Sequence, residues 1–267
     1  MEPMTNMRLL LAAACAVGLA AAPARAEDLT LVFKTTSKSG ASTSTSYYSS
    51  EKMRTGDAEH DTIVEYASGK ITSIDHKKKE YSEITADEME AAMKAASAKM
   101  EAASKQMEQQ MANLPPAVKE KMQGMMGGAV AAVTVTKGGT REVAGYSCQD
   151  YTIAMGASMT NKVCATTALK FPAPNVDYSR FSLFASMGTM MANNPMLKGM
   201  SKMADEMKKI EGFTIADTTS FAMMGQHMET SREATEIKKG PIPASAFDVA
   251  TIAKGYKKVP NPMTQMK

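Results

Sequence analysis

Two cysteines on either side of a short turn constrain the fold more than any other feature of this sequence. The runs around Cys148 and Cys164 are rich in residues that favour strands, and both cysteines are equidistant from Gly156. A tight antiparallel hairpin at Gly156-Ala157-Ser158 would bring the two thiols opposite each other. The same register would pair Asp150 with Lys162 on the cysteine face. We therefore predict a hairpin closed by a Cys148–Cys164 disulfide.

The first 26 residues have the pattern of a cleaved export signal. Arg8 precedes an apolar run from Leu9 to Ala22, and Ala24-Arg25-Ala26 places small residues where a signal peptidase cuts. We expect residues 1–26 to be removed after Ala26, so that a periplasmic chain begins at Glu27. A start codon at Met7 would give a more ordinary leader.

Loss of this leader changes the charge and the cysteine count. The formal charge falls from +3 to +2, because the leader contains two arginines and one glutamate. So small a charge gives no reason to expect nucleic acid as a partner. Cys15 leaves a lipoprotein open as an alternative, although Ala12-Ala13-Ala14 before it lacks the usual leucine. In an oxidising compartment, the remaining pair favours a disulfide over metal ligation or catalysis.

Short runs rich in Thr, Tyr, Ile and Val predict a meander of antiparallel strands before residue 85. These predicted strands are 29–36, 42–54, 62–67, 70–75 and 80–84. Further strands are predicted at 129–137, in the cysteine hairpin, at 213–223 and at 226–238. Gly240-Pro241-Ile242-Pro243 is expected to open an irregular tail.

Two helical regions interrupt the strands, and each carries methionines along one face. Thr85-Ala86-Asp87-Glu88 is a capping box that begins a long helix ending near Ala112, and Asn194-Pro195 begins the second helix. At 100° per residue, the methionines of each helix share one apolar stripe. The first stripe contains Met89, Met93, Met100, Met107 and Met111, and the second contains Met196, Met200, Met203 and Met207.

The sequence contains no recognisable catalytic motif. His60, His76 and His227 are scattered, and neither a Gly-x-Ser-x-Gly nor a phosphate-binding Gly-Lys-Ser/Thr motif is present. We therefore expect a protein that is not an enzyme and needs no cofactor.

The 26 methionines admit more than one interpretation. Methionine can replace leucine where amphipathic helices pack on a sheet, and it also suits a groove that accepts varied lipid or acyl chains. Candidates for binding a hydrophobic ligand are Met89, Met93, Met100, Met107, Met111, Met200, Met203 and Met207. Thioethers also bind Cu(I), and the alternative metal cluster is Met223, Met224, His227 and Met228.

Several segments resemble known bacterial families. Four segments are similar to the strand signature of periplasmic lipoprotein carriers of the LolA/LolB type: the runs 47–54 and 63–66, the run 71–75 with its Ile74-Asp75 turn, and Lys79-Glu80-Tyr81. Val143-Ala144-Gly145-Tyr146-Ser147-Cys148, Cys164 and the ending 242–259 resemble the bacterial domain-of-unknown-function 4412 family. The first resemblance implies an incomplete antiparallel barrel, and hydrophobic-ligand binding follows only by analogy.

Together these observations predict an α+β protein with a curved antiparallel sheet of about nine strands, an incomplete LolA-like barrel whose concave face is covered by the two helical insertions. We expect a single domain at 27–259 and a flexible tail at 260–267. The expected partner is a lipid or lipoprotein acyl chain. We expect a monomer without a stable membrane anchor, because no run after the leader approaches membrane-spanning length. A structural or interaction module of the cell envelope is a further alternative.

Overall fold

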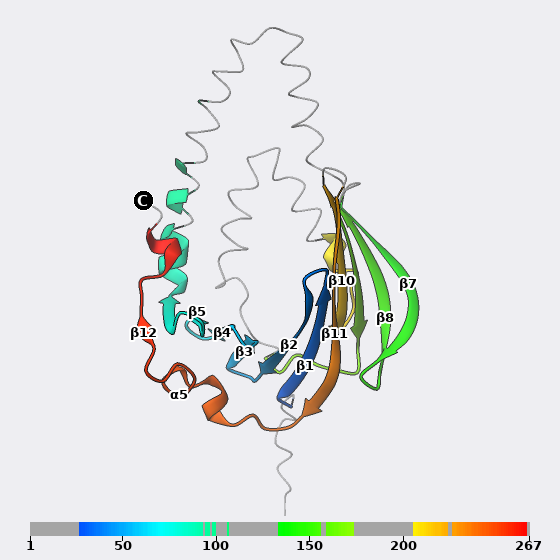
Figure 1. The fold of residues 1–267 in the computed structure, drawn as a ribbon. Coiled ribbons are helices and arrows are strands. Elements are labelled where there is room, and N and C mark those ends of the chain that lie inside the picture. The colour runs from blue at the N-terminus through cyan, green and yellow to red at the C-terminus, as the bar shows by residue number, and fades with distance from the viewer. Residues whose placement is uncertain are drawn as a thin grey trace, which may run out of the picture.

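The computed structural model describes residues 27–92, 94–96, 98–99, 106, 133–155, 159–173, 205–223 and 226–265. These residues form a twelve-stranded sheet in the order β12-β6-β5-β4-β3-β2-β1-β11-β10-β9-β8-β7. Neighbouring strands are antiparallel, except that β12 runs parallel to β6. The sheet is open and curved, with β12 and β7 at its two edges (Figure 1). This confirms the prediction of a curved, mostly antiparallel, unclosed sheet.

The sheet has twelve strands instead of the expected nine or so; the strands follow the predicted runs closely, with one division, one extension and one unpredicted strand, β12. The bounds are β1 Leu29–Ser37, β2 Gly40–Tyr48, β3 Lys52–Gly56, β4 His60–Glu65, β5 Lys70–Asp75, β6 Glu80–Ile84, β7 Val133–Val143, β8 Tyr146–Met155, β9 Met159–Thr166, β10 Phe213–Met223, β11 Gln226–Lys239 and β12 Lys257–Lys258. The predicted run 42–54 is two strands, because Ser49 Oγ accepts hydrogen bonds from the amides of Glu51 and Lys52 and forms a turn there. The strand predicted at 129–137 extends to Val143 as β7.

The two faces of the sheet carry different side chains, because directly opposed residues of an antiparallel pair project from the same face. We call the face that carries Val64 the inner face and the face that carries Ile63 the outer face. On the inner face, Val64 packs with Tyr66 and Ala173. On the outer face, Ile63 and Ile74 pack against Ala253.

The β8–β9 hairpin contains the predicted disulfide, but its predicted register is wrong. Cys148 and Cys164 are bonded with Cα atoms 5.4 Å apart. Met155 pairs with Met159, so Cys164 lies opposite Asp150, and Lys162 lies opposite Thr152 instead of Asp150. The hairpin is therefore centred one residue beyond Gly156, and the cysteines are diagonal neighbours. Asp150 pairs with Arg141 of β7 at 3.1 Å instead.

The capping box at Thr85 forms as expected. The amide of Glu88 donates to Thr85 Oγ1 at 3.2 Å, and the amide of Thr85 donates to Glu88 Oε2 at 2.9 Å. Residues 86–92 are helical. Residues 94–96, 98–99 and 106 of the first predicted helix are helical as well. The remainder of that helix and most of the second lie outside the described residues, as does their predicted covering of the concave face.

The sequence predicts an irregular tail after Gly240, but this segment has regular structure. It forms a 3-10 helix η1 (Ala244–Phe247), a short helix α5 (Val249–Ile252), strand β12 and a second 3-10 helix η2 (Pro262–Gln265). Figure 1 shows this segment passing along the outside of the sheet from the end of β11 to the edge at β6. Its apolar residues find partners on the outer face of β4 and β5, which the local sequence could not reveal.

Within the described ranges, no helix has the length and apolar character that a membrane crossing requires.

Candidate functional site

A polar groove lies on the outer face, between the sheet and the C-terminal segment. Its volume is about 620 Å³. One wall comes from β3 to β6 and carries Lys52, Glu65, Lys70 and Glu83. The other wall contains Ile242, Phe247 and Val249. We call this cavity the outer groove.

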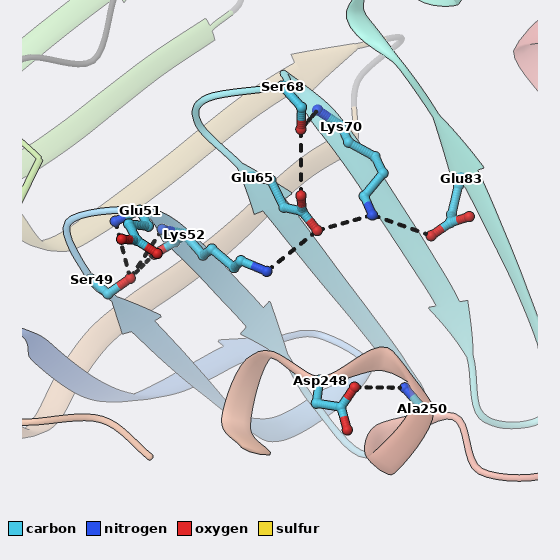
Figure 2. A network of polar contacts seen from close by, with 9 residues as sticks. All are labelled: Ser49, Glu51, Lys52, Glu65, Ser68, Lys70, Glu83, Asp248 and Ala250. Atoms are coloured by element: carbon cyan, nitrogen blue, oxygen red, sulfur yellow. Dashed lines mark hydrogen bonds and ion pairs between the residues drawn. The ribbon is translucent and has the colours of Figure 1, made fainter. Parts of the chain in front are cut away.

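Charges alternate along the sheet wall of the outer groove. Register places Lys52 opposite Glu65 and Glu65 opposite Lys70 on adjacent strands. Figure 2 shows Lys52, Glu65, Lys70 and Glu83 in one row across the sheet. The ion-pair distances are 3.4 Å for Lys52 and Glu65, 3.0 Å for Lys70 and Glu65, and 3.6 Å for Lys70 and Glu83. Lys258 of β12 pairs with Glu83 and completes a charge ladder of five residues.

The charge ladder shifts the pKa values of several members toward their charged forms. Burial raises the pKa of Glu65, but its hydrogen bonds and ion pairs with Lys70 and Lys52 outweigh burial and leave that pKa below its ordinary value. The hydrogen bond from Lys258 lowers the pKa of Glu83, and the hydrogen bond to Glu65 raises the pKa of Lys70. The two carboxylates and Lys70 between them are therefore ionised at neutral pH.

A buried carboxylate lies beside the outer groove and connects the sheet to the C-terminal segment. Only 3% of the Asp61 side chain is exposed. Arg54 donates from Nε and Nη2 to its two oxygens, each at 2.7 Å, and His76 Nε2 lies 2.9 Å from Oδ2. Arg54 also donates to the carbonyl of Ala246 at 3.0 Å, while His76 Nδ1 lies 2.9 Å from the Tyr256 hydroxyl.

These hydrogen bonds fix the orientation of the His76 ring and hold the C-terminal segment against the sheet. Because a carboxylate only accepts hydrogen bonds, His76 Nε2 carries the proton that faces Asp61. His76 Nδ1 and the Tyr256 hydroxyl share the second hydrogen bond of the ring. Sequence reasoning missed the cluster, because its members are separated along the chain and meet only through strand pairing and the return of residue 256. The one available signal was that Arg54 ends the predicted strand 42–54 and that Asp61 directly precedes the next predicted strand, 62–67.

An aromatic cluster lies on the inner face, opposite the outer groove. It contains Tyr48, Tyr66, Phe171 and Phe213, and we call it the inner aromatic cluster. The Tyr48 ring lies 5.3 Å from Phe213 and 5.8 Å from Phe171, both edge to face, and Tyr66 lies 6.0 Å from Phe171. Residues 171–173, which follow β9, thus reach across to β2 and β4. Tyr48, Phe171 and Phe213 are only partly buried.

Few of the predicted ligand-binding methionines fall in the described part of the chain. Met89 is partly buried in the helical residues 86–92, and Met207 is 40% exposed. The side chains of Met93, Met100, Met107, Met111, Met200 and Met203 lie outside the described residues. The predicted binding stripes therefore stay a prediction.

The alternative copper cluster gains no support from the described residues. His227 is exposed and Met228 is 50% exposed at the start of β11, while the side chains of Met223 and Met224 lie outside the described part of the chain. The described residues contain no group of three or more His, Cys, Asp or Glu side chains able to hold a metal ion.

Comparisons with known proteins identify a family but not an activity. No curated protein matches the chain. The structure of PNGF-II is similar at 10% identity and a TM-score of 0.40 over 88% of this chain, which spans 31% of the PNGF-II chain. The crystal structure of an uncharacterized conserved protein from Thermus thermophilus is similar at 5% identity and a TM-score of 0.42, over 88% of this chain and 91% of that one. Neither TM-score is high enough to carry an argument.

The family model of a domain of unknown function, DUF4412, matches residues 116–251. This range includes the disulfide hairpin, strands β10 and β11, and the segment that forms one wall of the outer groove. The matched range covers just over half of the 267 residues, and the protein therefore belongs to the DUF4412 family.

Proposed function

We propose that the protein is a non-enzymatic, periplasmic binding protein that holds the acyl chain of a lipid or lipoprotein against the inner face of its open sheet. The inner aromatic cluster is the observation that carries this proposal, because three of its four rings remain partly exposed. Aromatic rings supply large apolar contact areas at a low cost in conformational entropy.

The shape of the sheet supports the same proposal. An open, curved antiparallel sheet has one concave face on which an elongated apolar molecule can lie, and such concave apolar surfaces are the usual form of small-ligand sites. The incomplete barrel implied by the resemblance to LolA/LolB carriers would serve the same purpose. A disulfide in the β8–β9 hairpin is consistent with an oxidising compartment.

A fluorescent fatty-acid probe tests the proposal. The mature protein should bind the probe with increased fluorescence, and Phe171→Ala should weaken binding by about tenfold, because the substitution removes the ring that joins Tyr48 to Tyr66. Phe247→Ala is the matched control, because Phe247 packs on Tyr47 of the outer face. It should leave probe binding unchanged.

Two outcomes would contradict the proposal: no probe binding by the wild-type protein, or equal losses in the Phe171 and Phe247 variants. Thermal unfolding of each variant, followed by circular dichroism, separates a loss of binding from a loss of fold.

A further inference from the structure

The outer groove has two features that the inner-face proposal does not use: a charged wall and an apolar wall that face the same cavity. Its volume, about 620 Å³, lies within the range of roughly 300–1,000 Å³ typical of small-molecule sites. Ile242, Phe247 and Val249 on one wall are only partly buried. A ligand that fits both walls needs charged groups and an apolar group together.

Of the two lysines that line the outer groove, Lys52 has more capacity to donate hydrogen bonds to a ligand. Its ammonium group forms one ion pair among the described residues, with Glu65 at 3.4 Å, and Asp248 of the same groove acts on it only through its charge at longer range. The ammonium of Lys70, in contrast, lies between Glu65 and Glu83. An ammonium group has three donors, so Lys52 can donate to a further carboxylate without giving up Glu65. Lys52 ends the charge ladder within the outer groove (Figure 2).

Glu51 and Asp28 provide the complementary anions, and both line the outer groove. Among the residues that the structure describes, neither carboxylate forms an ion pair. Asp28 Oδ2 accepts one hydrogen bond, from the amide of Ile242 at 3.3 Å. A carboxylate offers about four acceptor positions, so both groups can accept from an ammonium ligand.

We propose that the outer groove binds short peptides that have free termini and an apolar side chain. Lys52 binds the terminal carboxylate, Glu51 and Asp28 bind the terminal ammonium, and the side chain contacts Phe247 and Ile242. Because the groove is open to solvent and its charges are partly screened, binding is weak and falls as salt is added.

Calorimetric titration of the mature protein with the tripeptide Ala-Phe-Ala tests this site. Acetylating the peptide's amino terminus or amidating its carboxyl terminus should each weaken binding by about tenfold, because each change removes one charge-assisted contact. Lys52→Met should weaken binding of the free peptide by a similar factor and should abolish the effect of amidation. A Glu51→Gln, Asp28→Asn double variant should abolish the effect of acetylation.

Lys162→Met is the matched control, because Lys162 is an exposed lysine of β9, away from the outer groove. It should leave peptide binding unchanged. Equal binding of free and doubly blocked peptides would overturn the proposal, as would no detectable heat at roughly millimolar peptide. The test is independent of the inner face: Phe171→Ala should leave peptide binding intact, and Lys52→Met should leave probe binding intact.

Discussion

At the scale of single residues, Asp61 controls how the outer face is assembled. Its carboxylate holds Arg54 and His76, and these two side chains in turn hold Ala246 and Tyr256 of the C-terminal segment. Removing one partner from such a buried pair leaves an uncompensated charge. The cluster therefore couples strands β3 and β4 to the segment that forms one wall of the outer groove.

Because Gly56 has no side chain, the Asp61 carboxylate can occupy the space beside it. A Cβ atom at Gly56 would lie 1.6 Å from Asp61 Oδ1, and Arg54 and His76 prevent that carboxylate from moving aside. Gly56→Ala should therefore destabilise the protein by roughly 2–4 kcal/mol in urea unfolding. Gly139→Ala, where nothing lies within 4 Å of the added Cβ, should change stability by less than about 0.5 kcal/mol. A Gly56→Ala protein as stable as this control would show that Asp61 is not fixed.

Asp217 gives stability an unusual dependence on pH. Burial raises its pKa in the folded protein, and the charge of Arg232 only partly offsets burial. As pH rises, the unfolded chain loses this proton first, so the contribution of Asp217 to stability falls between the unfolded and the folded pKa. Asp217→Asn should therefore stabilise the protein at pH 7 and have little effect below the ordinary carboxyl pKa of about 3.9.

Asp75→Asn is the control with the opposite sign. The hydrogen bond from the amide of Lys78 lowers the pKa of Asp75, so its ionised form stabilises the fold at neutral pH, and that stability is lost as pH falls. Urea unfolding of the wild-type protein and of both variants, at neutral and acidic pH, measures these opposite effects on stability. Lower stability of Asp217→Asn at pH 7 would mean that Arg232 outweighs burial.

At the scale of elements, the sequence predicts the strands and the disulfide of the β8–β9 hairpin but not the register of its pairing. Its two strands and its disulfide were predictable, because strand-forming runs flank a short turn and only two cysteines follow residue 26. Its register was not. The true pairing differs from the predicted one by two residues, and such a shift keeps every side chain on the same face. The alternation of polar and apolar residues therefore cannot distinguish the two registers.

The disulfide in this hairpin should contribute measurably to stability. For a sequence separation of 16 residues, loop entropy gives about 3 kcal/mol. Reductant should lower the free energy of unfolding by about that amount, and a Cys148→Ala, Cys164→Ala double variant should be equally unstable with and without reductant. Identical unfolding of the wild-type protein in both conditions would contradict this prediction.

At the scale of the whole molecule, the strands and the meander before residue 85 were predictable, but the pairing of strands that are distant in sequence was not. A run such as Leu29–Ser37 has the pattern of a strand, yet nothing local indicates that it pairs with Gln226–Lys239 at the other end of the chain. The C-terminal segment was missed for the same reason, since its partners Ile63 and Ile74 are distant in sequence. Both proposed sites depend on these long-range pairings, so the sequence alone could only suggest a class of ligand.

Native mass spectrometry of the protein purified from the cells that make it tests the central proposal, apolar-ligand binding, most directly. We expect a mature chain that begins at Glu27 and retains a lipid-sized molecule, which dissociates on collisional activation and is depleted in the Phe171→Ala variant but not in Phe247→Ala. A mature chain of bare mass, together with no uptake of the fatty-acid probe, would contradict it.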